Sequence, residues 1–152
     1  MDDAVTRVYS AALLNLAAEV EEPYHLTGKK LTAKAVSPIC GSEVTVEIIL
    51  KDNKVSEFGY EVEACALGRA VVAVMKRAVL GKTRAEIASA GEDLRKMLEE
   101  CEAEKGASYA AALSGDWSGL RNLLPAREYT ARHDAILLPF EAVEKAFISS
   151  SF

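Results

Sequence analysis

The sequence has few cysteines and histidines, with three of the former and two of the latter in 152 residues. Three cysteines at wide, irregular spacing are poor material for a disulfide framework, which favours free thiols or metal ligands instead. The chain also lacks an internal repeat, a low-complexity tract and a linker rich in proline, glycine and serine. Because half of its residues are hydrophobic, we expect one domain with a sizeable core over residues 1–152.

Long apolar runs and a basic surface are absent as well. No apolar run approaches the ~18 to 20 residues of a membrane span, and the N-terminal MDDAVTRVYS has acids where a signal peptide needs bases. The formal net charge is −5 at pH 7, and lysine and arginine are scattered along the chain. This distribution is unlike the basic patch of a protein that binds nucleic acid or anionic lipid. We therefore expect a cytoplasmic protein with no nucleic-acid or membrane partner.

Alternating hydrophobicity predicts three strands. Residues 31–36 alternate, and residues 43–50 place every second side chain on one apolar face. Residues 55–62 repeat this pattern after a polar KDNK turn, so the three strands are predicted to form an antiparallel meander. An amphipathic helix is predicted before them over residues 4–20, and a largely buried helix after them over residues 65–81. This order predicts an α+β fold.

Local start and stop signals predict the remaining helices. A capping-box pattern at residues 83–86 opens a helix that Gly91 is expected to divide. A short helix is expected to end at Pro125. The C-terminal helix is expected over residues 136–147, with Pro139 in its first turn, where a missing N–H has no cost.

Two of the three cysteines lie at the ends of predicted elements. Cys40, in SPICGSEV, stands between Pro38 and Gly41 on a predicted turn, and Cys65, in VEACALGRA, stands at a strand-to-helix junction. A thiol at that junction faces the unpaired N–H groups of the helix start, a position that suits a metal ligand or a reactive thiolate. A small buried hydrophobe is the alternative role for each. Cys101 continues an apolar helical stripe and is assigned to packing.

The two histidines differ in their surroundings. His133 stands beside Asp134 before the last helix, so one loop offers an imidazole and a carboxylate; the alternative is a helix cap beside a surface histidine. His25 is expected to be a solvated loop residue. Zinc and iron both accept thiolate, imidazole and carboxylate ligands together. A hydrolase that uses Cys40, His133 and Asp134 is disfavoured, because adjacent histidine and aspartate side chains rarely orient one another.

These motifs resemble a known family, the iron–sulfur cluster assembly scaffolds of the IscU, SufU and NifU N-terminal type. SPICGSEV resembles that family's N-P-x-C-G-D motif, and GYEVEACALGRA resembles its F-x-G-x-G-C-x-x-S-x-A motif. VLGKT resembles its V-K-G-K turn. TARHDAILLPFEAVEKA resembles its R-x-x-C-A-x-L-x-x-x-A-x-x-A segment, with Ala131 in place of the arginine. The long interval between Cys65 and this last motif is similar to the SufU branch, which tends to bind zinc.

The resemblance implies a meander backed by helices and a metal-ligand set. Cys40 and Cys65 match the family's first two cysteine ligands, Asp134 matches the third, and His133 matches the histidine before it. Ser42 replaces an aspartate of the family. A set of Cys40, Cys65, Asp134 and His133 suits zinc or iron, and it would hold at most a labile 2Fe–2S cluster, which prefers thiolates.

The function implied is that of a scaffold-like protein, not a stand-alone enzyme, that binds iron or zinc. The family's partners are a cysteine desulfurase, whose sulfur Cys40 would accept, and apo iron–sulfur recipient proteins. The alternative is a metal-free interaction or regulatory module of the same fold that contacts the desulfurase. The sequence leaves the oligomeric state open.

Overall fold

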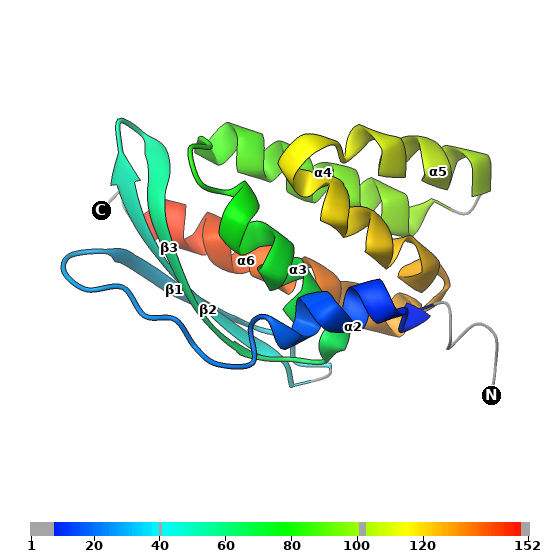
Figure 1. Cartoon of the computed structure of the whole chain (residues 1–152), viewed down its shortest axis with the longest axis horizontal. Coiled ribbons are helices and arrows are strands. Elements are labelled where there is room, and N and C mark those ends of the chain that lie inside the picture. Colours follow the sequence, from blue (N-terminus) through cyan, green and yellow to red (C-terminus); the bar gives the residue numbers. More distant parts are fainter. Residues whose placement is uncertain (1–7, 40, 101–102, 150–152) are drawn as a thin grey trace.

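The predicted meander is confirmed by the computed structural model, which describes residues 8–39, 41–100 and 103–149. Its three antiparallel strands, in the order β1-β2-β3 (Figure 1), are β1 (Leu31–Val36), β2 (Glu43–Lys51) and β3 (Lys54–Glu63). Asp52 and Asn53 join β2 to β3 with φ of 54° and 65°. Positive φ at both central residues is typical of the type I′ turn, whose twist matches that of paired strands.

Helices cover one face of this sheet. They are α2 (Ala11–Ala18), α3 (Ala66–Ala78), α4 (Arg84–Glu99), α5 (Ala103–Ala112), η1 (Gly115–Glu128), η2 (Thr130–Arg132) and α6 (His133–Ser149), where η marks a 3-10 helix. The last helix, α6, packs across β1 and β2, while α3 lies against β3 and α2 against α3 (Figure 1). The elements α4, α5 and η1 form an outer layer. The structure is therefore α+β, as predicted. No helix within the described ranges is long and apolar enough to cross a bilayer.

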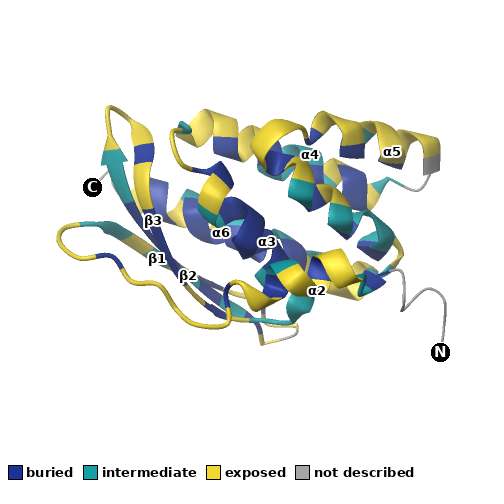
Figure 2. Cartoon of the chain, in the orientation of Figure 1, coloured by how far each residue is buried: buried dark blue, intermediate teal, exposed yellow. Residues whose placement is uncertain are grey.

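The core lies between the sheet and α3 and α6. Val44, Val46 and Ile48 of β2 are fully buried on the face that the helices cover (Figure 2). Lys34 and Glu61 are exposed on the other face. The alternation that predicted the strands therefore describes a sheet with one apolar and one mainly polar face.

The first predicted helix is not continuous in the structure. Within the described residues α2 begins at Ala11, because the Ser10 side chain accepts a hydrogen bond from the Leu13 N–H at 3.2 Å and caps the helix there. The predicted helix over residues 4–20 is therefore interrupted at Tyr9 and Ser10, since Val8 is helical, and α2 ends at Ala18; residues 1–7 of the predicted span lie outside the described residues.

Two prolines lie inside helical segments, where helix ends were predicted. Pro125 is within η1, and Pro139 is in the middle of α6, which begins at His133 and not at residue 136. Both predictions were wrong. Pro139 is buried together with Ile136 and Leu138, so packing outweighs the hydrogen bond that a proline removes from a helix.

The helix α4 is continuous through Gly91, so the predicted break was wrong. Its start is as predicted, with Thr83 and Glu86 forming a reciprocal capping box. A Cβ added at Gly91 would lie 2.9 Å from Cδ1 of Phe140 on α6. The glycine is explained by this close contact between α4 and α6.

Candidate functional site

One end of the sheet gathers the segments that carry the predicted ligands. The pairing register places Val36, Glu43 and Glu63 side by side, so the β1–β2 turn and the end of β3 lie at the same end. The turn is closed by the Ser37 N–H, which donates to the Ser42 carbonyl at 2.8 Å. Cys40 belongs to this turn in the sequence but lies outside the described residues, so its role as a ligand stays a prediction.

The second predicted ligand, Cys65, is the N-cap residue of α3. Its φ of −68° and ψ of 171° are extended, which turns the chain from β3 into the helix. The thiol is partly buried, and within the described residues it makes no capping hydrogen bond. The sulfur therefore stays at the positive end of a helix dipole without taking the usual acceptor role of a cap.

Arg69 adds a positive charge beside this junction. Its Nε donates to the carbonyl of Ala64 at 3.0 Å, and its Nη1 donates to that of Val20 at 3.4 Å. The guanidinium group thus fixes the residue directly before Cys65 and ties the junction to the end of α2. Sequence reasoning missed this role, although a basic residue four positions after Cys65 on a helix is a signal for it.

A close approach of two helices brings the start of α6 to the same place. A Cβ added at Gly68, in the first turn of α3, would lie 3.1 Å from the carbonyl oxygen of Ala135. Asp134 directly precedes Ala135 in the first turn of α6, and its side chain is exposed. The absence of a side chain at residue 68 therefore lets the segment after Cys65 and the segment after Asp134 pack closely.

His133 is anchored by the backbone of η1. Its Nε2 lies 3.0 Å from the Arg127 carbonyl oxygen and 3.3 Å from that of Ala126. Carbonyl oxygens only accept, so Nε2 is the protonated donor and Nδ1 is the basic nitrogen. Metal-binding histidines use this arrangement, with one nitrogen fixed and the other free for the ion. The ring lines a cavity of about 460 Å3 whose other lining residues are Leu98, Glu99, Glu100, Arg127, Glu128 and Thr130.

The three predicted ligands that the structure describes do not form a metal site without Cys40. In residues 8–39, 41–100 and 103–149, no three Cys, His, Asp or Glu side chains are close enough together to hold a metal ion. Cys65, His133 and Asp134 all fall in these ranges, so they lie on neighbouring elements without converging on one point. Their thiolate, imidazole and carboxylate donors still suit zinc or iron.

Two buried serines flank the β1–β2 turn. Ser42, which replaces the family's aspartate, is only 5% exposed, and Ser37 is 1% exposed. The Ser37 hydroxyl has no hydrogen-bond partner among the described residues. An unpaired buried hydroxyl is costly, so we expect its partner to be water or a group outside those residues.

A second polar cluster lies on the outer face of the sheet, where none was predicted. Glu47 is 6% exposed, and its carboxylate accepts from His25 Nδ1 at 2.8 Å and the Leu26 N–H at 2.7 Å, with Lys30 Nζ at 3.2 Å. Burial alone raises the pKa of Glu47, but the hydrogen bonds from His25, Leu26 and Lys30 outweigh it and hold the pKa below its usual 4.5. His25 is an exposed loop residue, as predicted, with its side chain 51% exposed, but its contact with Glu47 was not predicted.

Comparison with solved structures decides the family. The crystal structure of a nitrogen-fixing NifU-like protein (N-terminal) from Brucella abortus is 34% identical to this chain, with a TM-score of 0.82. The alignment covers 95% of this chain and 94% of that one. The chain belongs to the family of NifU-like N-terminal domains. The family suggested by the cysteine motifs is thereby confirmed.

Two more distant structures share the fold of this NifU-like chain. A candidate iron–sulfur cluster assembly scaffold protein for the SUF system from Fervidobacterium islandicum AW-1 is 19% identical over 91% of this chain and 96% of its own, with a TM-score of 0.73. A hypothetical protein is 17% identical over 93% of this chain and 97% of its own, with a TM-score of 0.72. No family model matches the sequence, and no curated protein matches it significantly.

Proposed function

We propose that this NifU-like protein is a scaffold-like component of iron–sulfur cluster assembly that binds iron or zinc. The observation that carries the proposal is the position of Cys65. The thiol lies at the N-terminus of α3, beside Arg69, and α3 packs against the start of α6 through Gly68. Membership of the NifU-like family and the role of the similar SUF-system protein as an assembly scaffold support the same function.

The proposed ligands are Cys40, Cys65 and Asp134, with His133 as a fourth. The chemistry of the donors favours a single zinc or iron ion, because one carboxylate and one imidazole replace the thiolates that a cluster prefers. Any 2Fe–2S cluster assembled here would be labile cargo. Because His133 Nε2 is fixed by two carbonyl groups, its Nδ1 is the nitrogen that would bind the ion.

Sulfur would reach this site from a cysteine desulfurase. In the proposed step the Cys40 thiolate attacks the terminal sulfur of a persulfide on the desulfurase. A new S–S bond forms at Cys40 while the donor's S–S bond breaks, and the electron pair of that bond leaves on the desulfurase cysteine as a thiolate. Sulfur and any assembled cluster would then pass to apo iron–sulfur recipient proteins.

A second function is favoured by the separation of the ligands. His133 lines a cavity together with Glu100 and Thr130, and Cys65 does not line it. An interaction or regulatory module that contacts the desulfurase without metal would need no convergence of these side chains. We rank it second because the thiol at the start of α3 has no structural role in capping that helix within the described residues.

Anaerobic metal titration of the protein, purified without a histidine tag, separates the two functions. The wild type should bind zinc or iron(II), and Cys65→Ala should bind at least about tenfold more weakly. Cys101→Ala is the matched control. Cys101 lies outside the described residues, and the sequence predicts that it packs in an apolar stripe, so the metal content of this variant should match the wild type. If the wild type and Cys65→Ala bind metal equally, and both bind a cysteine desulfurase, the interaction module replaces the scaffold.

A further inference from the structure

Among the described residues, the outer edge of β3 has backbone partners at two places, Tyr60 and Val55. Near one end, the Tyr24 N–H donates to the Tyr60 carbonyl at 2.9 Å, and the Tyr60 N–H donates back at 2.8 Å. Near the other end, the Val55 N–H donates to the Lys82 carbonyl at 3.0 Å and the Gly81 N–H to the Val55 carbonyl at 2.8 Å. The loops before β1 and after α3 thus pair with this edge on either side of Phe58.

The stretch between these ends is open. Backbone groups of successive strand residues alternate in direction, so those of Phe58 point to the same edge as those of Tyr60. Among the described residues none pairs with Phe58 on that side. Unpaired N–H and C=O groups on a sheet edge are a template for another strand. At about 3.3 Å per residue, the interval from Val55 to Tyr60 has room for about four residues of extended chain.

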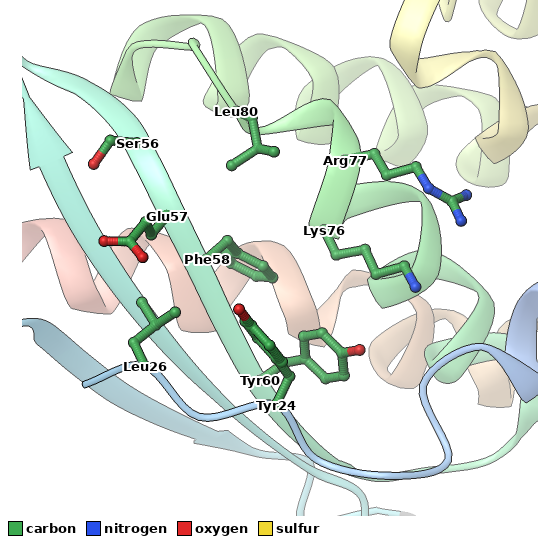
Figure 3. A pocket seen from close by; sticks show the side chains of 9 residues that line it. All are labelled: Tyr24, Leu26, Ser56, Glu57, Phe58, Tyr60, Lys76, Arg77 and Leu80. Carbon is green, nitrogen blue, oxygen red and sulfur yellow. The ribbon is translucent and has the colours of Figure 1, made fainter.

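A groove runs along this open stretch, between β3 and the C-terminal half of α3. Its volume is about 400 Å3, within the range of binding pockets. Figure 3 shows Phe58 and Tyr60 on the strand side and Leu80 toward one end, with Tyr24 beside Tyr60 at the other. Tyr24 is 56% exposed and Leu80 is 45% exposed. The groove therefore combines an aromatic and aliphatic wall with hydrogen-bonding backbone groups.

The helix side of the groove is positively charged. Lys76 and Arg77 lie on α3 across the groove from β3, and in Figure 3 their side chains extend away from the strand. Both contact one carboxylate oxygen, Oε1 of Glu19, at 3.2 Å from Lys76 Nζ and 2.6 Å from Arg77 Nη2. Two positive charges thus share one negative charge, and the Glu57 carboxylate of the strand points away from them (Figure 3). The remaining charge favours an acidic occupant.

We propose that this groove binds an extended, acidic segment of a partner protein as an additional strand on β3. The backbone of the segment pairs with Phe58, an apolar side chain lies against Phe58 and Leu80, and a carboxylate faces Lys76 and Arg77. Strand addition in a groove between a sheet edge and a helix is an established mode of peptide recognition. The proposal does not depend on metal binding, because none of the predicted metal ligands lines the groove.

A display library of random seven-residue peptides tests this proposal by selection on the full-length protein. One form of the library displays the peptides inside a longer chain, and the other displays them with a free C-terminus. Enriched peptides are synthesised and titrated calorimetrically. We expect apolar residues next to a carboxylate in the enriched sequences. N-methylation at successive backbone positions should weaken binding about tenfold at alternate positions only, since every second N–H faces β3. Amide exchange at Phe58 should slow when the peptide is bound.

Variants of Lys76 and Arg77 test the positively charged side of the groove. Reversing both charges, with Lys76→Glu and Arg77→Glu, should weaken the binding of the peptide at least about tenfold. The single change Arg77→Gln, at a side chain that is 67% exposed, should weaken it less and guards against a folding defect in the double variant. Lys51→Glu with Lys54→Glu is the control, with the same charge change at two exposed positions of the β2–β3 hairpin, and should leave binding unchanged.

Several results overturn the proposal. One is a selection that yields no peptide sensitive to Arg77→Gln. A second is a peptide that tolerates N-methylation at every position, or that leaves Phe58 exchange unchanged, because it does not bind as a strand. A third is displacement of every enriched peptide by a small aromatic acid such as benzoate, which would make the groove a small-molecule site.

Discussion

Two polar regions of the same sheet differ in whether their polar groups have hydrogen-bond partners within the protein. On the outer face, the Glu47 carboxylate accepts hydrogen bonds from three partners and holds the loop before β1 against β2 and β3. At the end of the sheet, Cys65 makes no capping bond within the described residues, Asp134 is exposed and the Ser37 hydroxyl has no described partner. A saturated cluster serves the fold, whereas groups left without protein partners are available to a ligand.

The largest effect on stability is expected from Glu47→Ala. It leaves the Leu26 N–H unpaired in a buried position and removes the partner of His25 and Lys30. We expect a loss of about 2–3 kcal/mol in the free energy of unfolding, measured with urea, and unchanged metal affinity. Glu61→Ala is the control, because Glu61 is half exposed and 3.9 Å from His25. A stability loss that is equal in both variants would show that Glu47 has no special structural role.

A smaller loss of stability, combined with weaker metal binding, is expected from Gly68→Val. A side chain at this position meets the Ala135 carbonyl, so α3 and the start of α6 must move apart. The expected cost is about 1–2 kcal/mol, and the proposed ligands Cys65 and Asp134 separate with the helices. Ala107→Val, at an exposed position of α5, controls for the helix propensity of valine. Metal affinity equal to that of the wild type would remove Gly68 from the proposed site.

The smallest effect is the pH dependence of stability that Glu47 contributes. Since the folded-state pKa of Glu47 lies below its usual 4.5, its contribution to stability is present above that value and is lost as the pH falls through the folded-state pKa. The wild type should therefore lose more stability than Glu47→Gln when the pH is lowered from about 6 through this range. Parallel stability curves for the two proteins would show that the Glu47 pKa is not lowered by folding.

The sequence predicted the sheet well because each signal for it was local. Alternation defined the three strands, the KDNK turn defined their hairpin, and T-x-x-E at residues 83–86 defined the start of α4. The errors have a common origin in contacts between distant segments. Pro139 lies inside α6 because it packs in the core, and Gly91 lies inside α4 because Phe140 comes close to it. The periodic pattern of hydrophobic residues gives no information about contacts between distant segments.

The candidate site was predictable only where its signals are local in the sequence. The motif around Cys65 was sufficient to place that residue at the start of α3, since a strand pattern directly precedes a helix pattern there. The sequence did not reveal that His25 would meet Glu47, because 22 positions separate them and the contact depends on how the loop crosses the sheet. Nor did it reveal that Nε2 of His133 would be held by carbonyl groups of η1.

The measurement that tests the proposed metal site most directly is anaerobic reconstitution of wild type and Asp134→Cys with iron, sulfide and thiol. A carboxylate is a harder donor than a thiolate, so the wild type should hold only a labile cluster. Asp134→Cys restores the third thiolate of the family and should keep its visible cluster absorbance longer. If both proteins bind no more iron, zinc or cluster than Cys40→Ala/Cys65→Ala, the site at the start of α3 is not a metal site.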